Sequence, residues 1–176
     1  AGVNFLSTIP SLYWVDRLGR RKLLLIGAAG MTVGHVLAGT IFVIGCEDDD
    51  GTISCKPVMG ELIVVFAAIF IFFFAISWGP IGWIYPSEIF PLHVRAKCVS
   101  LSTAANWTMG SLMIAIVKLF PILTIAGVFY LFAILCVACF IFVYKNCPET
   151  KGILLEEIEF LFNKEVKKRG PASAAI

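Results

Sequence analysis

The chain has 176 residues, of which 59% are hydrophobic and 15% are charged, with a formal net charge of +2. A water-soluble domain is usually about 45–50% apolar and about 25% charged, so this composition excludes an ordinary soluble domain. The small net charge gives no reason to expect a nucleic-acid partner. We expect the lipid bilayer to surround most of the chain.

The first apolar stretch, Ala1–Val15, is too short to cross a membrane. A helix rises about 1.5 Å per residue and the hydrocarbon core is about 30 Å thick, so a full span needs roughly 20 residues. The stretch has no initiating Met, no basic start and no small-residue cleavage site, which argues against a signal peptide. We interpret it as the second half of a helix and therefore expect the chain to be a fragment of a longer protein.

Four longer apolar stretches follow, each of about 20 residues with no Asp, Glu, Lys or Arg and at most one His. The predicted fold class is therefore an all-α membrane protein. The remaining residues, 153–176, begin with an amphipathic pattern that predicts a short helix along the membrane surface. We predict a partial span at residues 1–15 and full spans at 23–45, 62–83, 98–117 and 125–144, all within one transmembrane domain over residues 1–152.

The first full span has small residues on one face, and the loop after it contains two cysteines. Gly30, Gly34 and Ala38 recur every four residues, and such a face lets another helix backbone approach closely. Cys46 and Cys55 share the following loop, where a disulfide and two free thiols are both compatible with the sequence.

The second full span contains Gly79 and Pro80 between aromatic residues. Glycine and proline interrupt the backbone hydrogen bonds of a helix, and within a membrane the freed groups are tolerated only where protein or a cavity satisfies them. Transporters place broken helices of this kind at their binding sites. We therefore predict a helix break at Gly79 and Pro80, although the neighbouring aromatic rings would also suit the membrane interface.

The third full span has a polar band at three- and four-residue intervals. Polar side chains in hydrocarbon are costly unless they face a protein partner or a water-filled cavity. Hydrogen bonding between helices would explain the band, but the broken helix beside it favours a hydrophilic pathway. The band consists of Ser100, Thr103, Asn106, Trp107, Gly110 and Ser111.

Lysine and arginine are distributed unevenly between the two sides of the predicted spans. If the spans alternate in direction, all but Lys56 and Lys118 of the 14 basic residues lie on the same side. The positive-inside rule then places the loops after Val15 and Tyr85, and the C-terminus, in the cytoplasm.

Three segments on the predicted cytoplasmic side resemble, in order and spacing, the signature loops of the sugar porter family of the major facilitator superfamily. They are Asp16–Arg21 (D-R-L-G-R-R), Pro86–Pro91 (P-S-E-I-F-P) followed by Arg95-Ala96-Lys97, and Pro148–Gly152 (P-E-T-K-G). The resemblance implies a partial C-terminal helix bundle of such a carrier, comprising the end of helix 8 and helices 9 to 12. The sequence Trp78–Pro86 is similar to fungal members.

The resemblance also implies two sets of functional residues. The family's sugar contacts correspond here to Asn4, Phe74, Trp83, Asn106 and Trp107. Asparagine amides both donate to and accept from sugar hydroxyls, and tryptophan rings pack on the apolar face of a pyranose. Where hexose facilitators have a Glu on the broken helix, this chain has Ala75. A charged cluster at the cytoplasmic helix ends would act as a conformational latch and would consist of Asp16, Arg20, Arg21, Glu88 and Arg95.

The implied function is carbohydrate transport by alternating access, most simply in the plasma membrane. The substrate would be a monosaccharide or polyol, with a proton as the candidate co-transported ion. Two alternatives remain open: a proton symporter for polyols or quinate-type acids, and a transporter-like nutrient sensor. Nothing in the residues indicates an enzyme, a metal site or a cofactor. Because the resemblance begins inside helix 8, we expect this chain alone not to transport.

Overall fold

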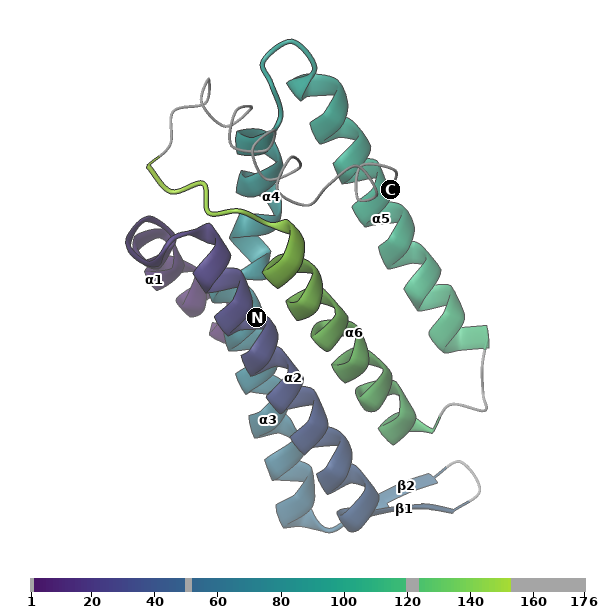
Figure 1. The fold of residues 1–176 in the computed structure, drawn as a ribbon. Coiled ribbons are helices and arrows are strands. Elements are labelled where there is room, and N and C mark those ends of the chain that lie inside the picture. The colour runs from purple at the N-terminus through teal and green to yellow at the C-terminus, as the bar shows by residue number, and fades with distance from the viewer. Residues whose placement is uncertain (1, 50–51, 120–123, 153–176) are drawn as a thin grey trace.

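The computed structural model describes residues 2–49, 52–119 and 124–152. Over these ranges the chain forms a bundle of helices with one short β-hairpin at one end (Figure 1). The predicted amphipathic helix of the tail, within residues 153–176, lies outside the described residues. The elements are α1 (Gly2–Leu18), α2 (Arg20–Gly45), β1 (Cys46–Asp49), β2 (Thr52–Cys55), α3 (Pro57–Ile76), α4 (Trp78–Ile89), α5 (Arg95–Leu119) and α6 (Ile125–Asn146).

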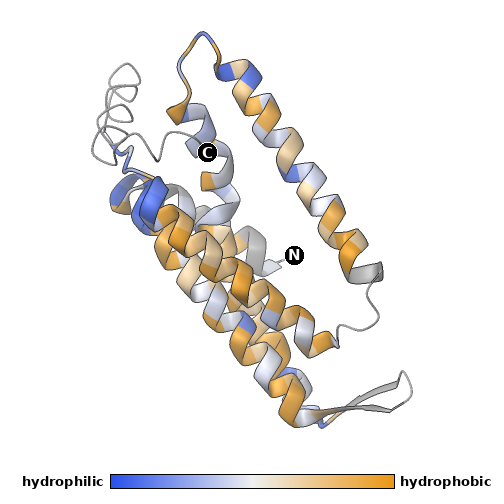
Figure 2. Ribbon diagram, turned by 45° about the vertical axis from the view of Figure 1, so that its right-hand side comes forward, coloured by the Kyte–Doolittle hydropathy of each residue, from blue (hydrophilic) through white to orange (hydrophobic). Residues whose placement is uncertain are grey.

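The fold is that of an all-α membrane protein. Among the described residues, three helical segments are long and apolar enough to cross a membrane: α2, the α3–α4 segment Pro57–Ile89, and α6. Their outer faces expose large apolar side chains, such as Val64 (68% exposed) and Ile134 (66%), that would be unfavourable in water. Apolar residues accordingly follow the lengths of these helices in Figure 2. Helix α5 has 25 residues but does not belong to this group, because its polar band lowers its hydropathy; its role as a span stays a prediction.

Helix α2 lies at the centre of the bundle and packs against both α3 and α6. A Cβ at Gly30 would overlap the ring of Phe73, and a Cβ at Gly34 would lie 3.2 Å from the Phe70 Cβ and from the Phe66 carbonyl oxygen. The phenylalanines of α3 therefore fill the spaces that these two glycines leave open. The predicted close-packing role of the small-residue face is confirmed at Gly30 and Gly34.

The helix break between α3 and α4 lies at Ser77, two residues before the predicted Gly79. Ser77 has φ −127° and ψ −82°, whereas Gly79 and Pro80 lie within the first turn of α4. The displacement follows from the geometry of proline, whose ring excludes a hydrogen bond to the carbonyl four residues earlier. For Pro80 that carbonyl belongs to Ile76, the last residue of α3. Pro80 itself fits the first turn, where its missing N–H would have had no intrahelical partner.

The β-hairpin was not predicted from the sequence, which indicated only a loop between two spans. Strands β1 and β2 pair antiparallel, with Cys46 opposite Cys55, and these two residues form a disulfide. The bond joins the end of α2 to the start of α3, where Pro57 occupies the first helical turn. Of the two possibilities left open for Cys46 and Cys55, the structure contains the disulfide.

The opposite end of the bundle has an apolar core that brings α1, α2, α4 and α6 together. Two polar groups at its edges have backbone partners: the Trp78 indole donates to the Leu24 carbonyl oxygen at 3.1 Å, and the Tyr85 hydroxyl donates to the Pro148 carbonyl oxygen at 3.1 Å. The core consists of Val15, Leu23, Leu24, Ile81, Tyr85 and Val143. It fixes the orientation of α4, which contributes to both parts of the candidate site.

Candidate functional site

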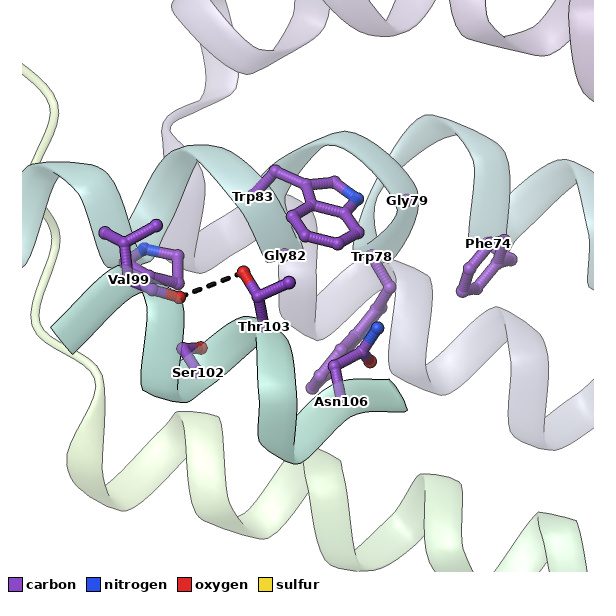
Figure 3. Close-up of a pocket in the computed structure, with 10 residues that line it drawn as sticks. Phe74, Trp78, Gly79, Gly82, Trp83, Val99, Ser102, Thr103 and Asn106 are labelled. Carbon is purple, nitrogen blue, oxygen red and sulfur yellow. Dashed lines mark hydrogen bonds between the residues drawn. The ribbon is translucent and has the colours of Figure 1, made fainter. Parts of the chain in front are cut away.

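A cavity of about 410 Å³ lies between α4 and α5, beside the helix break (Figure 3). Its volume is within the range of about 300–1,000 Å³ that is usual for small-molecule sites. We call it the first cavity. It is lined by Phe74, Trp78, Gly79, Gly82, Trp83, Pro86, Val99, Ser102, Thr103 and Asn106.

Three of the predicted sugar contacts, Phe74, Trp83 and Asn106, come together at the first cavity. Trp107 does not line it and is 67% exposed. Asn4 belongs to α1, and its side chain lies outside what the structure describes. Of the predicted break residues, Gly79 lines the cavity and Pro80 does not.

The polar groups of the first cavity differ in whether they already have partners. Thr103 donates to the Val99 carbonyl oxygen at 2.9 Å, so its proton is used within α5. In the described part of the chain, neither the Asn106 amide nor the Ser102 hydroxyl has a hydrogen-bond partner. Both groups are therefore available to a ligand hydroxyl. Sequence reasoning missed Ser102: it lies one helical turn before Asn106, but that spacing does not show whether its hydroxyl is free.

Aromatic rings form another wall of the first cavity. Phe74 comes from the end of α3, whereas Trp78 and Trp83 come from the first turns of α4. Such rings pack on C–H groups and exclude water, while the amide and hydroxyls of α5 offer hydrogen bonds. The cavity thus combines an apolar wall with a hydroxyl-binding wall, which is the chemistry that a carbohydrate requires.

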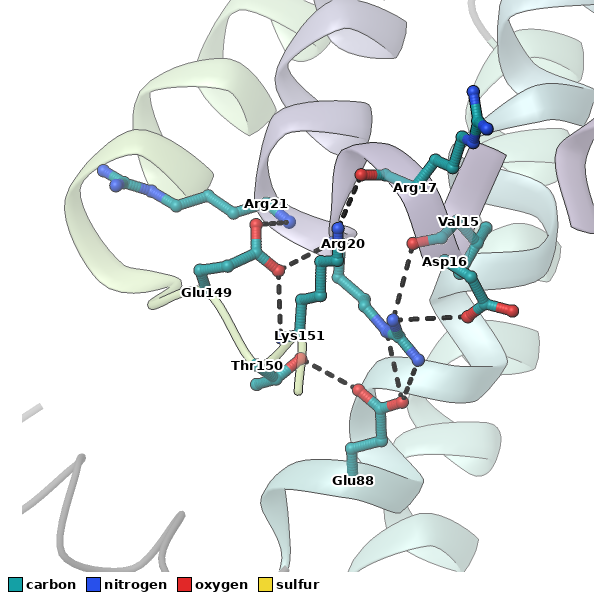
Figure 4. Close-up of polar contacts among 9 residues, drawn as sticks. All are labelled: Val15, Asp16, Arg17, Arg20, Arg21, Glu88, Glu149, Thr150 and Lys151. Atoms are coloured by element: carbon teal, nitrogen blue, oxygen red, sulfur yellow. Dashed lines mark hydrogen bonds and ion pairs between the residues drawn. The ribbon is translucent and has the colours of Figure 1, made fainter. Parts of the chain in front are cut away.

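A cluster of charged and polar side chains lies at the core end of the bundle, around Arg20 (Figure 4). The Arg20 guanidinium donates to Glu88 Oε1 from both Nε (3.2 Å) and an Nη atom (2.9 Å). These two side chains are 16% and 20% exposed, so water screens their interaction only partly. Arg20 also contacts Asp16 at 3.5 Å, but Asp16 is 79% exposed, and an exposed pair of this kind contributes at most about 1 kcal/mol.

The segment after α6 completes this cluster. Thr150, which is buried, donates to the second oxygen of Glu88 at 2.9 Å. The Glu149 carboxylate accepts the backbone N–H groups of Arg20 at 2.8 Å and Arg21 at 3.2 Å. These are the first two N–H groups of α2, so Glu149 caps that helix from a distant segment. We define the charged cluster as Asp16, Arg20, Glu88, Glu149 and Thr150.

The remaining predicted members of the cluster have other partners. The Arg21 guanidinium donates to the Tyr144 carbonyl oxygen at 2.8 Å and joins the cluster only through its backbone N–H. Arg95 donates to the Phe90 carbonyl oxygen at 3.1 Å, within its own loop. Sequence reasoning recognised Pro148–Gly152 as a signature but assigned no role to Glu149 or Thr150. No group of three metal-binding side chains occurs among the described residues.

Comparisons of the sequence with a family model and with curated proteins point to the same family. Residues 1–162 match the family model described as "Sugar (and other) transporter". Over 93% of its length, the chain is 39% identical to Hexose transporter 2 of Kluyveromyces lactis and 38% identical to the galactose transporter of Saccharomyces cerevisiae. It spans 29% of the length of each of these curated relatives.

This chain also has a fold similar to that of a solved structure. The proton:xylose symporter XylE from E. coli, bound to 6-bromo-6-deoxy-D-glucose, superposes with a TM-score of 0.73 and 29% sequence identity. The match covers 91% of this chain and 33% of XylE.

Proposed function

Because the chain belongs to the Sugar (and other) transporter family, we propose that it forms part of a membrane carrier that moves a monosaccharide or polyol by alternating access. A family of transporters is not a family of enzymes, so this chain is not an enzyme. The observation that carries the proposal is the first cavity, which combines a free Asn106 amide with the rings of Phe74 and Trp83. In this proposal all three contact the substrate, and Asn4 and Trp107 complete the contacts in the whole carrier.

We assign the chain to the C-terminal part of the carrier, from the end of helix 8 through helix 12, with residues 1–152 in the transmembrane domain. The order of the three signature loops supports this assignment. The hairpin lies at one end of the bundle and the junction of α1 with α2, where Arg20 begins the second helix, lies toward the other (Figure 1), which supports a cytoplasmic C-terminus and an extracellular disulfide. We further propose a fungal source, since the two relatives compared above are from yeasts. We also propose a plasma-membrane location, where a carrier for external sugar would act.

The charged cluster is proposed to act as a conformational latch at the cytoplasmic end. Arg20 and Glu88 join the start of α2 to the end of α4, and Thr150 and Glu149 bind the segment after α6 to both. Helix ends held in this way move together, and they can separate only if these charge-assisted hydrogen bonds break. The latch therefore favours one of the two conformations that alternating access requires. Arg21 and Arg95 stabilise neighbouring backbone rather than the latch itself.

The test begins with the native transcript, read through to its start codon. A reading frame that continues upstream through about seven further spans is expected. The full-length protein is then expressed in cells that lack their own hexose carriers, and uptake of labelled hexoses and polyols is measured. The expected result is saturable uptake by the full-length protein and none by this chain alone. Absence of uptake for every sugar, with the protein confirmed at the cell surface, would contradict the proposed function.

The same assay decides whether a proton accompanies the sugar. XylE is a proton:xylose symporter, so a proton is the candidate co-transported ion. Collapse of the proton gradient with an ionophore should abolish accumulation above the external concentration if transport is coupled. Uptake that is unchanged by the ionophore would identify a uniporter instead.

A further inference from the structure

A second cavity, of about 460 Å³, lies between α4 and α6, and no function proposed above uses it. Its walls are mainly apolar and include Leu24, Ile81, Ile89, Phe142 and Val143. Cys147, the residue after α6, lies at its edge with a free thiol. A cavity of this size and character is large enough for one aromatic ring system.

The two cavities meet over one face of α4. Trp78, Gly82 and Pro86, spaced four residues apart on that helix, line both cavities, and so does Ser102 of α5. Residues at this spacing share a helix face. A Cβ added at Gly82 would meet no atom within 4 Å, so the space above this glycine is open. The second cavity is therefore a continuation of the first.

The two parts of this continuous space have different chemistry. The first cavity offers the unpartnered Asn106 amide and the Ser102 hydroxyl, which suit a ligand rich in hydroxyl groups. The second has apolar walls around Phe142 and Val143, which suit a ligand part that water solvates poorly. One molecule that has both parts is a glycoside with an aromatic aglycone.

We propose that the second cavity is an aglycone subsite: aryl glycosides bind with the sugar in the first cavity and the aromatic group in the second. This inference rests on the proposed function, because it requires a sugar in the first cavity. An aryl glycoside bound in this way holds both cavities occupied and competes with the transported sugar. Its aromatic group also covers the Cys147 thiol.

The experiment uses the full-length protein in membranes and the sugar that competes best in the uptake panel. Inhibition constants are measured for the methyl and naphthyl glycosides of that sugar. Burial of the aromatic ring should make the naphthyl glycoside bind at least about 10-fold more tightly. The Phe142→Ala variant should bring the ratio of the two constants closer to one. The matched control is Phe140→Ala, which removes a phenylalanine ring from a position on α6 that does not line the cavity. This variant should leave the ratio unchanged.

Alkylation of individual cysteines, read by mass spectrometry, gives an independent result. Saturating naphthyl glycoside should protect Cys147, whereas methyl glycoside should not, and alkylation of Cys139 should be the same in both cases. Equal affinities of the two glycosides, or no protection of Cys147, would overturn the aglycone subsite alone. Failure of both glycosides, together with the free sugar, to compete would overturn the proposed function and the subsite together.

Discussion

The Glu149 carboxylate binds the backbone N–H of Arg20 at 2.8 Å, although the two residues are 129 positions apart in the chain. The same carboxylate accepts the N–H of Arg21, so it provides the cap that the sequence before α2 lacks, since Gly19 has no side chain. A negative charge at this position also interacts favourably with the helix dipole. The segment after α6 is thus bound to the start of α2 by backbone hydrogen bonds as well as by side chains.

Replacement of Gly19, the residue before α2, by alanine should destabilise the protein. Gly19 has φ +87° and ψ +157°, a region accessible almost only to glycine, and holding another residue there costs about 1–3 kcal/mol. A Cβ at this position would also lie 2.5–2.8 Å from the Glu149 carboxylate atoms. Thermal unfolding of the full-length protein in detergent should show a lower midpoint for Gly19→Ala. Gly2→Ala, at a glycine with open space around it, is the control. Equal midpoints would contradict the capping geometry.

Exchange of the charges of Arg20 and Glu88 should distinguish a latch from unrelated surface charges. Glu88→Gln leaves the Arg20 guanidinium with weaker acceptors, and a hydrogen bond between charged groups contributes about 1.5–3 kcal/mol. The single variants should therefore shift the equilibrium between inward- and outward-facing forms and slow transport. The double variant Arg20→Glu with Glu88→Arg should recover part of the loss. Accessibility of cysteines placed on either side of the membrane measures this equilibrium. Single variants with unaltered accessibility and transport would exclude the latch.

The helices were predictable from the sequence because the apolar runs are long and uninterrupted, and each predicted stretch within the described ranges is helical. The helix break was predicted two residues too late, because a proline acts on the carbonyl four residues before it, and for Pro80 that residue is Ile76. The charged cluster was predicted only in part. Arg20 and Glu88 lie in recognisable motifs, but Glu149 acts through the backbone of a segment far away in sequence, which no local pattern encodes.

The residues of the first cavity were likewise predictable only in part. Asn106 followed from the polar band and the family resemblance, and Phe74 and Trp83 from the resemblance, whereas Trp78 was not among the predicted contacts. Ser102 was not predicted either, because the sequence cannot show which hydroxyls of α5 are already bonded to their own helix. Ser100 and Thr103 donate to the carbonyl oxygens of Ala96 and Val99 at 2.8 and 2.9 Å. Only the structure distinguishes these two hydroxyls from that of Ser102.

Replacement of Ser102 by alanine should weaken sugar binding by about 3- to 10-fold, because a neutral hydrogen bond contributes about 0.5–1.5 kcal/mol. The matched control is Ser100→Ala, which removes the same hydroxyl from an exposed position outside the cavity. A deoxy sugar that lacks the hydroxyl contacted by Ser102 should bind Ser102→Ala and the unmodified protein equally, and a panel of deoxy sugars identifies that hydroxyl. Equal effects of Ser100→Ala and Ser102→Ala on every sugar would show that Ser102 makes no specific contact.

Alkylation of Cys147 should require a higher pH than alkylation of an exposed cysteine. Burial raises the pKa of the Cys147 thiol, while the nearby Tyr85 hydroxyl and the positive charge of Arg21 lower it to a smaller extent. The reactive thiolate therefore forms only above the usual pKa of cysteine, about 8.5. Arg21→Gln removes the favourable charge, so it should move the alkylation profile to still higher pH. Rates with iodoacetamide across a pH series measure the profile. A profile for Cys147 that matches a model cysteine peptide would contradict this environment.

The most direct test of the first cavity as a sugar site is the equilibrium dissociation constant of the transported sugar for the full-length protein and its Asn106→Ala variant. Asn106 offers both a donor and an acceptor to adjacent hydroxyls, so its loss should weaken binding by about 10-fold or more, with the thermal unfolding midpoint unchanged. The same substitution at Asn146, at the end of α6 and outside the first cavity, should have little effect on the sugar constant. Undiminished binding by Asn106→Ala would show that the sugar binds elsewhere and would contradict the assignment of the cavity between α4 and α5.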